Sequence, residues 1–300
     1  MLEFVQHVIN GLSLGSIYAL VAIGYTMVFG ILRLINFAHG EVYMLGAFAG
    51  FYVVRWMGFA QNPSLAALLI TLVAAMAFCA AAGFCIERLA YKPLRGAPTI
   101  NVLITAVGVS LFLQYTGQLV FGSDPQFFPP VYQPQAAWEW GELKVNPIQV
   151  AILIISTVLM GILQFVLFRT RVGRAMRAVQ FNHDLARLMG ISTDKIISYT
   201  FMFGSALAGA AGVLVGLAYP KIDPLMGVLP GLKSFAAAVL GGIGNVTGAF
   251  LGAILLGLAE EFLAAYWSPT YRDALAFAIL ILILLIKPTG LLGKKQTEKV

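Results

Sequence analysis

The chain has 300 residues, of which 60% are hydrophobic and 11% are charged. Soluble domains average about 45–50% apolar and about 25% charged residues, so this composition excludes an ordinary soluble globular protein. The net charge is +6, but the lysines and arginines gather in a few loops between apolar runs, which argues against a nucleic-acid-binding surface.

Apolar stretches separated by turn residues dominate the chain, and most are long enough to cross a bilayer. They cover residues 8–31, 37–55, 64–86, 100–121, 148–168, 196–218, 234–264 and 273–286. The sequence therefore predicts an all-α polytopic membrane protein with about eight transmembrane segments. All of them are assigned to a single domain, residues 1–300, in which one or two segments are broken or re-entrant.

A polar cluster lies between the first two stretches, where residues 33–43 read RLINFAHGEVY. A charged side chain at the bilayer centre costs about 2.5–3.5 kcal/mol on insertion scales, so such residues lie at an interface or line a cavity. Arg33 is interpreted as an anchor at the inner edge. The candidates for a translocation pathway are Asn36, His39 and Glu41. Asn36 could also cap the following helix, and for Glu41 a hydrogen-bonded structural role is favoured over substrate contact.

Residues 122–147 form the predicted outer loop. The loop has one lysine against three acids, and basic residues are depleted on the outer side of a membrane. Aromatic side chains of the kind found at a membrane–water interface are frequent in and beside it: Phe121, Phe127, Phe128, Tyr132, Trp138 and Trp140.

The most distinctive segment is the basic loop 169–195, RTRVGRAMRAVQFNHDLARLMGISTDK. Six of its side chains are basic, against the two acids Asp184 and Asp194. Basic loops stay on the cytoplasmic side of a membrane, so this loop is placed inside. The same rule places residues 87–98 and the lysine-rich C-terminal tail inside.

The basic loop is predicted to contain two short helices, over residues 174–180 and 183–189. Asn182 can cap the second helix, and Gly190 can end it. An apolar strip on this second helix consists of Leu185, Leu188 and Met189. Basic amphipathic helices can lie on anionic lipid, but docking into a groove of another protein is favoured because the loop is long for a connector.

A glycine-rich break, GGIGN at residues 241–245, interrupts the stretch 234–264. Each glycine costs a helix about 1 kcal/mol relative to alanine. If the C-terminal tail lies on the inner side, the stretch 234–264 must contain a broken or re-entrant pair of segments. Such a pair enters the membrane and returns to the side from which it started. Non-helical backbone at membrane depth is tolerated only when it is buried in protein or lines a cavity, so the break is a candidate pathway element. Its candidate residues are Gly241, Gly242, Gly244 and Asn245. Tight helix packing is the alternative, and it is favoured from Gly248 onward.

Signatures of catalysis are missing from the sequence. There is no Ser-His-Asp pattern, zinc-ligand set, dinucleotide fingerprint or phosphate loop; GLLGKK at 290–295 has the wrong spacing and no hydroxyl. His39 and Glu41 stand two positions apart and do not share a helix face, so they predict no metal site. The chain is therefore expected to be no enzyme and to hold no cofactor. Its energy source is either an ion gradient or a partner protein.

Four stretches of the chain are similar to one family. They are INGLSLGSIYALVAIGYTMVFGILRLINFAHGEVYMLGAF near the start, GRAMRAVQFNHDLARLMGI in the basic loop, PGLKSFAAAVLGGIGNVTGAFLGA around the glycine break, and KPTGLLG near the end. With these motifs the chain resembles the membrane permease subunits of branched-chain amino-acid ABC importers, the LivH type of the LivH/LivM permease family.

The resemblance implies a multi-pass permease domain in the bacterial inner membrane, with a cytoplasmic C-terminus, that forms half of a pathway for leucine, isoleucine and valine. It also implies three kinds of protein partner: a homologous second permease of the LivM type, two cytoplasmic ABC ATPases that use the ATP, and a periplasmic substrate-binding protein. The lipid bilayer is the remaining partner, and no nucleic acid is implied. The outer loop 122–147 is then periplasmic.

Within the basic loop, DLARLMG resembles a degenerate form of the importer coupling loop, in which a small residue stands four positions before a glycine. Ala186 and Gly190 match that spacing. The loop 169–195 is therefore interpreted as the cytoplasmic coupling loop. Its candidate ATPase-coupling residues are Arg174, Arg177, Asp184, Leu185, Ala186, Arg187 and Gly190.

Two other functions stay open at this point. Relatives with the same core import urea or short-chain amides. An ion-coupled secondary transporter would share the hydrophobicity and the broken helices, but the basic loop and the scarcity of deep acids count against it. The only candidates for such acids, Glu260 and Glu261, stand near the end of their stretch, which indicates an interfacial position.

Overall fold

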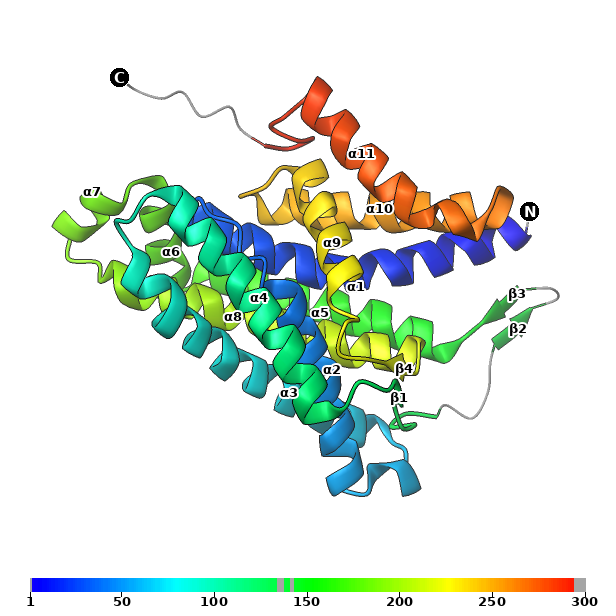
Figure 1. Ribbon diagram of the computed structural model, residues 1–300. Helices are drawn as coiled ribbons and strands as arrows, with labels where there is room; N and C mark the ends of the chain where they lie inside the picture. The colour runs from blue at the N-terminus through cyan, green and yellow to red at the C-terminus, as the bar shows by residue number, and fades with distance from the viewer. Residues whose placement is uncertain (1, 134–137, 141–142, 294–300) are drawn as a thin grey trace.

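Helices make up most of the computed structural model of the protein, which describes residues 2–133, 138–140 and 143–293 (Figure 1). The α-helices are α1 (Leu2–Leu32), α2 (His39–Trp56), α3 (Leu65–Ile86), α4 (Thr99–Phe121), α5 (Pro147–Arg169), α6 (Arg171–Phe181), α7 (His183–Leu188), α8 (Thr193–Ala218), α9 (Val228–Gly241), α10 (Val246–Tyr266) and α11 (Arg272–Ile286). Strands in the described part are short and form two antiparallel pairs, β1 (Gln126–Phe127) with β4 (Lys221–Ile222) and β2 (Trp138–Trp140) with β3 (Leu143–Val145). The predicted all-α class is confirmed.

Parts of two predicted segments lie outside the described residues. They are residues 134–137 and 141–142 of the outer loop, and residues 294–300 of the C-terminal tail, which include its lysines.

Seven helices of the described chain are long and apolar enough to cross a membrane. They are α1, α3 continued to Leu94, α4, α5, α8, α10, and α11 together with the turn before it, Pro269–Ile286. The sequence predicted about eight segments, and the one that is missing from this set is α2, since the predicted stretch 234–264 is represented by α10. Helix α9 has 14 residues, which is too few to cross a bilayer alone. The stretch 234–264 is broken as predicted, because α9 ends at Gly241 and α10 begins at Val246.

Helices α2 and α9 both begin inside the bundle. α1 ends before Arg33, whose φ of 57° turns the chain back. The ring of His39, the first residue of α2, packs against Gly24, about two turns before the end of α1. The start of α9 reaches the same place, because the backbone of Gly227 lies against that of Gly40. The expected one or two broken segments are therefore α2, with the loop before it, and α9.

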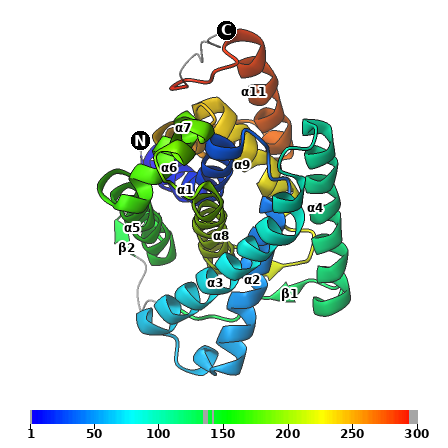
Figure 2. The ribbon, with the colours of Figure 1, turned by 90° about the vertical axis from the view of Figure 1, so that its left-hand side faces the viewer.

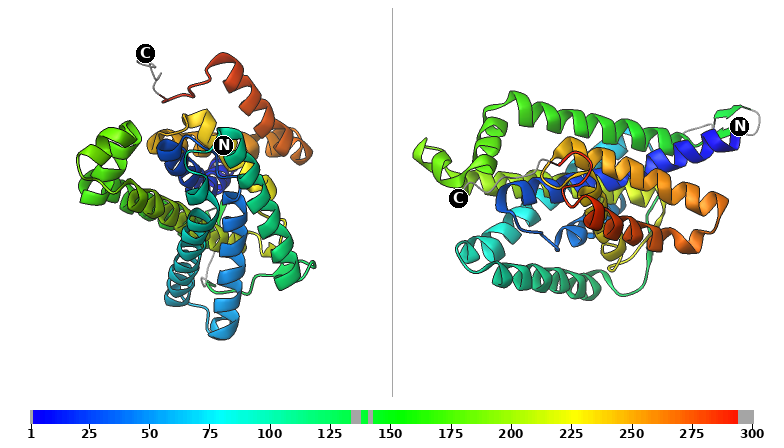
Figure 3. Two further views of the ribbon diagram at one scale, coloured as in Figure 1. Left: turned by 60° about the vertical axis from the view of Figure 1, so that its left-hand side comes forward. Right: turned by 90° about the horizontal axis from the view of Figure 1, so that it is seen from above.

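Helix α1 runs through the bundle between α10 and α5 and also packs against α8 and α9 (Figure 3). Glycines bring α1 and α10 into backbone contact. A Cβ atom on Gly257 would overlap the backbone of Gly15, and one on Gly15 would stand 2.8 Å from the Cα atom of Ile254. Gly248 and Gly252 pack in the same way against α9. The packing role predicted for these glycines of α10 is confirmed.

The bundle has two different ends. The N-terminus and the β2–β3 pair lie at one end, and α6 and α7 lie at the other, which faces the viewer in Figure 2. The chain after α11 joins the α6–α7 end, where the Leu291 N–H donates to the Leu240 carbonyl (2.8 Å) and the Leu292 N–H to the Gly241 carbonyl (3.0 Å). The α3–α4 connection also lies there (Figure 1). This agrees with the predicted topology, in which all these segments face one side.

Candidate functional site

The place where α2 and α9 begin is called the central crossing, and it is formed by Tyr25 of α1, residues 39–41 and residues 227–231. Glycine makes it possible. A Cβ atom on Gly40 would stand 2.5 Å from the Gly227 carbonyl oxygen, and one on Gly231 would stand 3.0 Å from the Gly40 Cα atom. Larger residues at these positions would force the two helix starts apart, so the crossing depends on the missing side chains.

Asn36 and His39 are both buried near this crossing, with 2% and 1% of their surface exposed. The His39 ring meets the Tyr25 ring edge to face, with centroids 4.8 Å apart. The Asn36 Oδ1 atom accepts a hydrogen bond of 2.9 Å from the Tyr91 hydroxyl. The predicted capping role of Asn36 is therefore wrong. The residue that precedes α2 is Ala38, which has no side-chain oxygen, and Asn36 is turned toward the end of α3 instead.

Glu41 lies in the first turn of α2, where a negative charge is favoured by the helix dipole. Its Oε1 atom accepts hydrogen bonds from Gln114 Nε2 (2.8 Å) and Ser110 Oγ (3.3 Å), both on α4. Only 2% of its surface is exposed. The other oxygen, Oε2, has no hydrogen-bond partner in the described part of the chain.

The glycine break lies elsewhere, at the α6–α7 end. Gly242 and Gly244 adopt φ values of 110° and 94°, which end α9 and turn the chain into α10. The Asn245 Oδ1 atom accepts from the Gly248 N–H (3.2 Å) and caps α10, while its amide donates to the Leu292 carbonyl (2.9 Å). The structure therefore separates the predicted pathway residues into two groups. Asn36, His39 and Glu41 lie inside the bundle, whereas Gly241, Gly242, Gly244 and Asn245 lie where it meets α6.

The two helices predicted in the basic loop are both present, as α6 and α7. Asn182 caps α7 as predicted, because its Oδ1 atom accepts from the N–H groups of Asp184 (2.9 Å) and Leu185 (3.0 Å). Gly190 follows with a φ of 79°, the left-handed conformation in which glycine ends helices.

The predicted apolar strip lies on the outside of the molecule. Leu185, Leu188 and Met189 are 53%, 82% and 82% exposed. Phe181, at the end of α6, is 85% exposed and extends the strip, although the sequence reasoning missed it. We call these four residues the α7 strip. Their exposure at one end of the bundle leaves an apolar surface of the kind that marks a protein contact.

The other predicted coupling residues link this surface to the bundle or flank it. Ala186 is the buried residue of α7, while Asp184 and Arg174 are exposed. The following contacts fasten the loop: Arg187 Nε to Thr193 Oγ1 (3.0 Å), the His183 ring to the Ile31 carbonyl (2.7 Å), and the Arg177 guanidinium over the Phe168 ring (5.1 Å). A displacement of α7 would therefore be transmitted to the end of α1 and to the start of α8.

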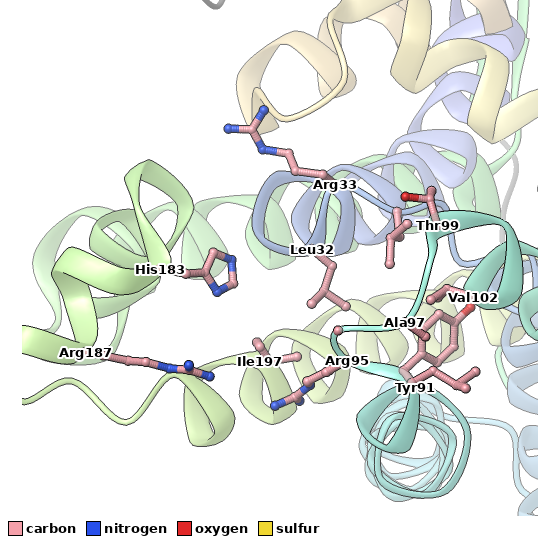
Figure 4. A pocket seen from close by; sticks show the side chains of 13 residues that line it. Leu32, Arg33, Tyr91, Arg95, Ala97, Thr99, Val102, His183, Arg187 and Ile197 are labelled. Carbon is pink, nitrogen blue, oxygen red and sulfur yellow. The ribbon is translucent and has the colours of Figure 1, made fainter. Parts of the chain in front are cut away.

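A cavity of about 300 Å³ lies between these elements (Figure 4). Arg95, His183 and Arg187 lie on one side of it, and Tyr91 and Val102 lie on the other. Arg95 also forms ion pairs with Glu87 and with Asp194 at the start of α8. The α3–α4 connection and α8 are thereby held together beside the basic loop 169–195.

Another cluster of charges was not predicted from the sequence. Lys233 of α9 is buried and forms ion pairs with Glu260 (3.1 Å) and Asp273 (2.6 Å). Glu260 also accepts a hydrogen bond from the Tyr18 hydroxyl (3.1 Å). Glu260 is 1% exposed, so its carboxylate is buried in the bundle, and its expected position at the membrane interface stays a prediction. The sequence does carry a signal for this cluster, which is the single lysine Lys233 within an apolar helix. A buried charge of this kind needs a partner of opposite charge.

Comparison with known proteins decides the family. Residues 7–284 match the family described as the permease component of the branched-chain amino acid transport system. The chain belongs to this permease family. It is 43% identical to the high-affinity branched-chain amino acid transport system permease protein LivH of Escherichia coli K12, over all of this chain and 98% of that protein. It is 43% identical to the corresponding protein BraD of Pseudomonas aeruginosa, over 99% and 98%.

A more distant relative is the inner membrane ABC transporter permease protein YjfF of E. coli, 28% identical over 82% of this chain and 73% of its own length. No solved structure matches the chain. A member of this permease family is a membrane transport subunit and not an enzyme, and its family implies ABC partner subunits. The comparisons support this function and give no support to an ion-coupled secondary transporter. Among the described residues, no three His, Cys, Asp or Glu side chains could hold a metal ion together.

Proposed function

We propose that this chain is the LivH-type permease of an ATP-driven importer for leucine, isoleucine and valine, and that it forms half of the translocation pathway. The observation that carries the proposal is the 43% identity, over essentially the whole chain, to high-affinity branched-chain amino acid permeases of two bacteria. The match spans the loops as well as the apolar stretches, because it covers 99–100% of this chain.

The pathway is proposed to pass the central crossing. Transporters commonly place substrate near discontinuous helices whose ends lie within the membrane, and α2 and α9 have this form. Asn36, His39 and Glu41 are the proposed pathway residues there. The glycine break, Gly241, Gly242, Gly244 and Asn245, is proposed as a second pathway element at the inner end.

The α7 strip is proposed to dock into a groove of an ATPase subunit. Ala186 lets α7 lie close to the bundle, and Gly190 provides the turn into α8. The surrounding residues that complete the proposed contact are Arg174, Arg177, Asp184, Leu185 and Arg187. Closure of the ATPases would then move α8 and α1 through the Arg187–Thr193 and His183–Ile31 contacts.

The proposed assembly contains a second permease of the LivM type, two cytoplasmic ATPases that hold the ATP, and a periplasmic binding protein. This chain is proposed to hold no cofactor of its own. In the bacterial inner membrane the basic loop 169–195 and the C-terminus face the cytoplasm, and the loop 122–147 faces the periplasm, because basic loops are retained inside.

The test is uptake by the complex reconstituted in proteoliposomes, with ATP inside and the binding protein outside. Radiolabelled leucine is expected to accumulate only when ATP and the binding protein are both present. Isoleucine and valine should compete, whereas urea and acetamide should not. Uptake that persists without ATP and collapses with an ionophore, or competition by urea, would overturn the proposal.

A further inference from the structure

The buried carboxylate of Glu41 is satisfied on one side only. Oε1 accepts hydrogen bonds from two neutral side chains of α4, Gln114 and Ser110, so neither donor brings a compensating charge. Oε2 has no hydrogen-bond partner within the described residues, although only 2% of the surface of Glu41 is exposed. Burying a carboxylate oxygen without a donor is costly, so the site is incomplete as it stands.

The unsatisfied oxygen faces the central crossing. A Cβ atom on Gly227 would stand 3.0 Å from Glu41 Oε2, so this oxygen points to the residue just before α9. The positive end of the α9 dipole lies beside it, and the Tyr25 hydroxyl lies near Gly231 one turn further on. A carboxylate oxygen and a helix N-terminus thus lie side by side inside the bundle, which suits a ligand that carries both charges.

Two polar side chains of α4 hold the other oxygen of Glu41, Oε1. Ser110 and Gln114 are half-buried and lie one turn apart on α4, a helix that otherwise presents mostly apolar side chains. Polar residues in a membrane helix mark a functional path more often than a lipid contact.

We propose that Glu41 Oε2 accepts a hydrogen bond from the α-ammonium group of the transported amino acid at the central crossing. The inference rests on the proposed function, because that function supplies a zwitterionic substrate. The ammonium group is shared by leucine, isoleucine and valine, and its N–H groups form the strong, charge-assisted hydrogen bonds that a buried carboxylate requires. The carboxylate of the same amino acid would face the start of α9.

The alternative is that Glu41 only ties α2 to α4. Glu41→Gln separates the two roles, since glutamine keeps an acceptor oxygen for Gln114 and Ser110 but loses the charge. The expected result for Glu41→Gln is an assembled complex in which leucine uptake falls about tenfold or more, with partial recovery in Glu41→Asp. Ser110→Ala is the matched control, because it removes one donor from Oε1 and leaves the charge. Equal losses in Ser110→Ala and Glu41→Gln would contradict the proposal.

A binding measurement tests the same contact without transport. Ser110→Cys, placed in a background of Cys79→Ala and Cys85→Ser, is labelled with a maleimide in the purified complex. Leucine should slow the labelling several-fold, whereas 4-methylpentanoate, which is leucine without its ammonium group, should not. Glu41→Gln should abolish the protection by leucine. Protection by both compounds alike, or by neither, would overturn the proposal.

The proposed function and the role of Glu41 can be contradicted separately. If the unmodified complex does not import leucine, the proposed function is wrong. If it imports leucine and Glu41→Gln imports it equally well, the proposed function stands and the role assigned to Glu41 is wrong.

Discussion

Lys233 shows how a single buried charge constrains this protein. Its ammonium group joins α9 to Glu260 on α10 and to Asp273 at the start of α11, and Tyr18 of α1 completes the cluster. Removing one member of a buried ion pair leaves the other charge without compensation, whereas removing both is tolerated far better. The cluster therefore holds the short helix α9 in place, and its contribution can be measured.

Lys233→Met is expected to lower the free energy of unfolding by about 3–5 kcal/mol, because Glu260 would remain buried and unpaired. Lys233→Met combined with Glu260→Leu should recover most of that loss. Asp273→Asn is the control, and it should cost less than about 1 kcal/mol since Asp273 is 52% exposed. Unfolding of the purified permease in detergent, followed by denaturant titration, measures all three. Equal stability of Lys233→Met and the unmodified protein would refute this role.

A side chain at position 190 would find open space, but it would strain the backbone. Nothing lies within 4 Å of a Cβ atom placed there, yet its φ of 79° costs an L-residue about 1–2 kcal/mol. Gly190→Val should therefore leave expression intact and abolish ATP hydrolysis stimulated by substrate, because the turn between α7 and α8 changes. Gly161→Ala on α5 meets equally open space in a helical conformation, and it should leave both properties unchanged. Normal stimulated hydrolysis in Gly190→Val would argue against a coupling role for this turn.

At the scale of helices, the contact between α1 and α10 depends on glycine. Gly257→Leu would drive a side chain into the backbone at Gly15, and overpacking of this kind costs about 1–3 kcal/mol. Gly161→Leu faces open space on α5 and should be nearly neutral. The thermal unfolding temperature of each variant, measured in detergent, distinguishes them. Similar temperatures for Gly257→Leu and Gly161→Leu would show that the two helices do not need this close approach.

Some elements could be predicted from the sequence because their signals are local. Helices α6 and α7 follow from residues that act on their neighbours, such as the cap Asn182 and the terminator Gly190. The inner starts of α2 and α9 could not be predicted in this way. They depend on contacts of Gly24 with His39 and of Gly40 with Gly227, which join distant parts of the chain.

Polar groups at single positions also depend on contacts between distant parts of the chain. Asn36 has the side chain of a helix cap, but the helix begins at His39, and the Asn36 amide oxygen accepts a hydrogen bond from Tyr91 instead. The pairing of Glu260 with Lys233 was not predicted, because the two residues lie 27 positions apart in different helices. In both cases a long-range partner decided the position of a polar group, and spacing along the chain carries no signal for such partners.

At the scale of the whole molecule, the orientation in the membrane remains a prediction. The N-terminus and the α6–α7 end lie at opposite ends of the bundle (Figure 1). A reporter fused after residue 300 is expected to be active only on the cytoplasmic side, and one inserted within residues 126–140 only on the periplasmic side, because the basic loops are retained inside. Alkaline phosphatase and green fluorescent protein fusions in cells measure this. The reverse pattern would overturn the assigned orientation.

The proposal that α7 is the contact through which ATPases drive transport can be tested directly by crosslinking. A photoreactive benzoylphenylalanine replaces Leu188, which is 82% exposed on the α7 strip, in membranes that contain the active complex. Leu119, which is 88% exposed near the end of α4, is the control position. Illumination at position 188 is expected to yield an adduct with an ATPase subunit, and illumination at 119 should yield none. An active complex in which position 188 reacts only with lipid would contradict the proposed coupling.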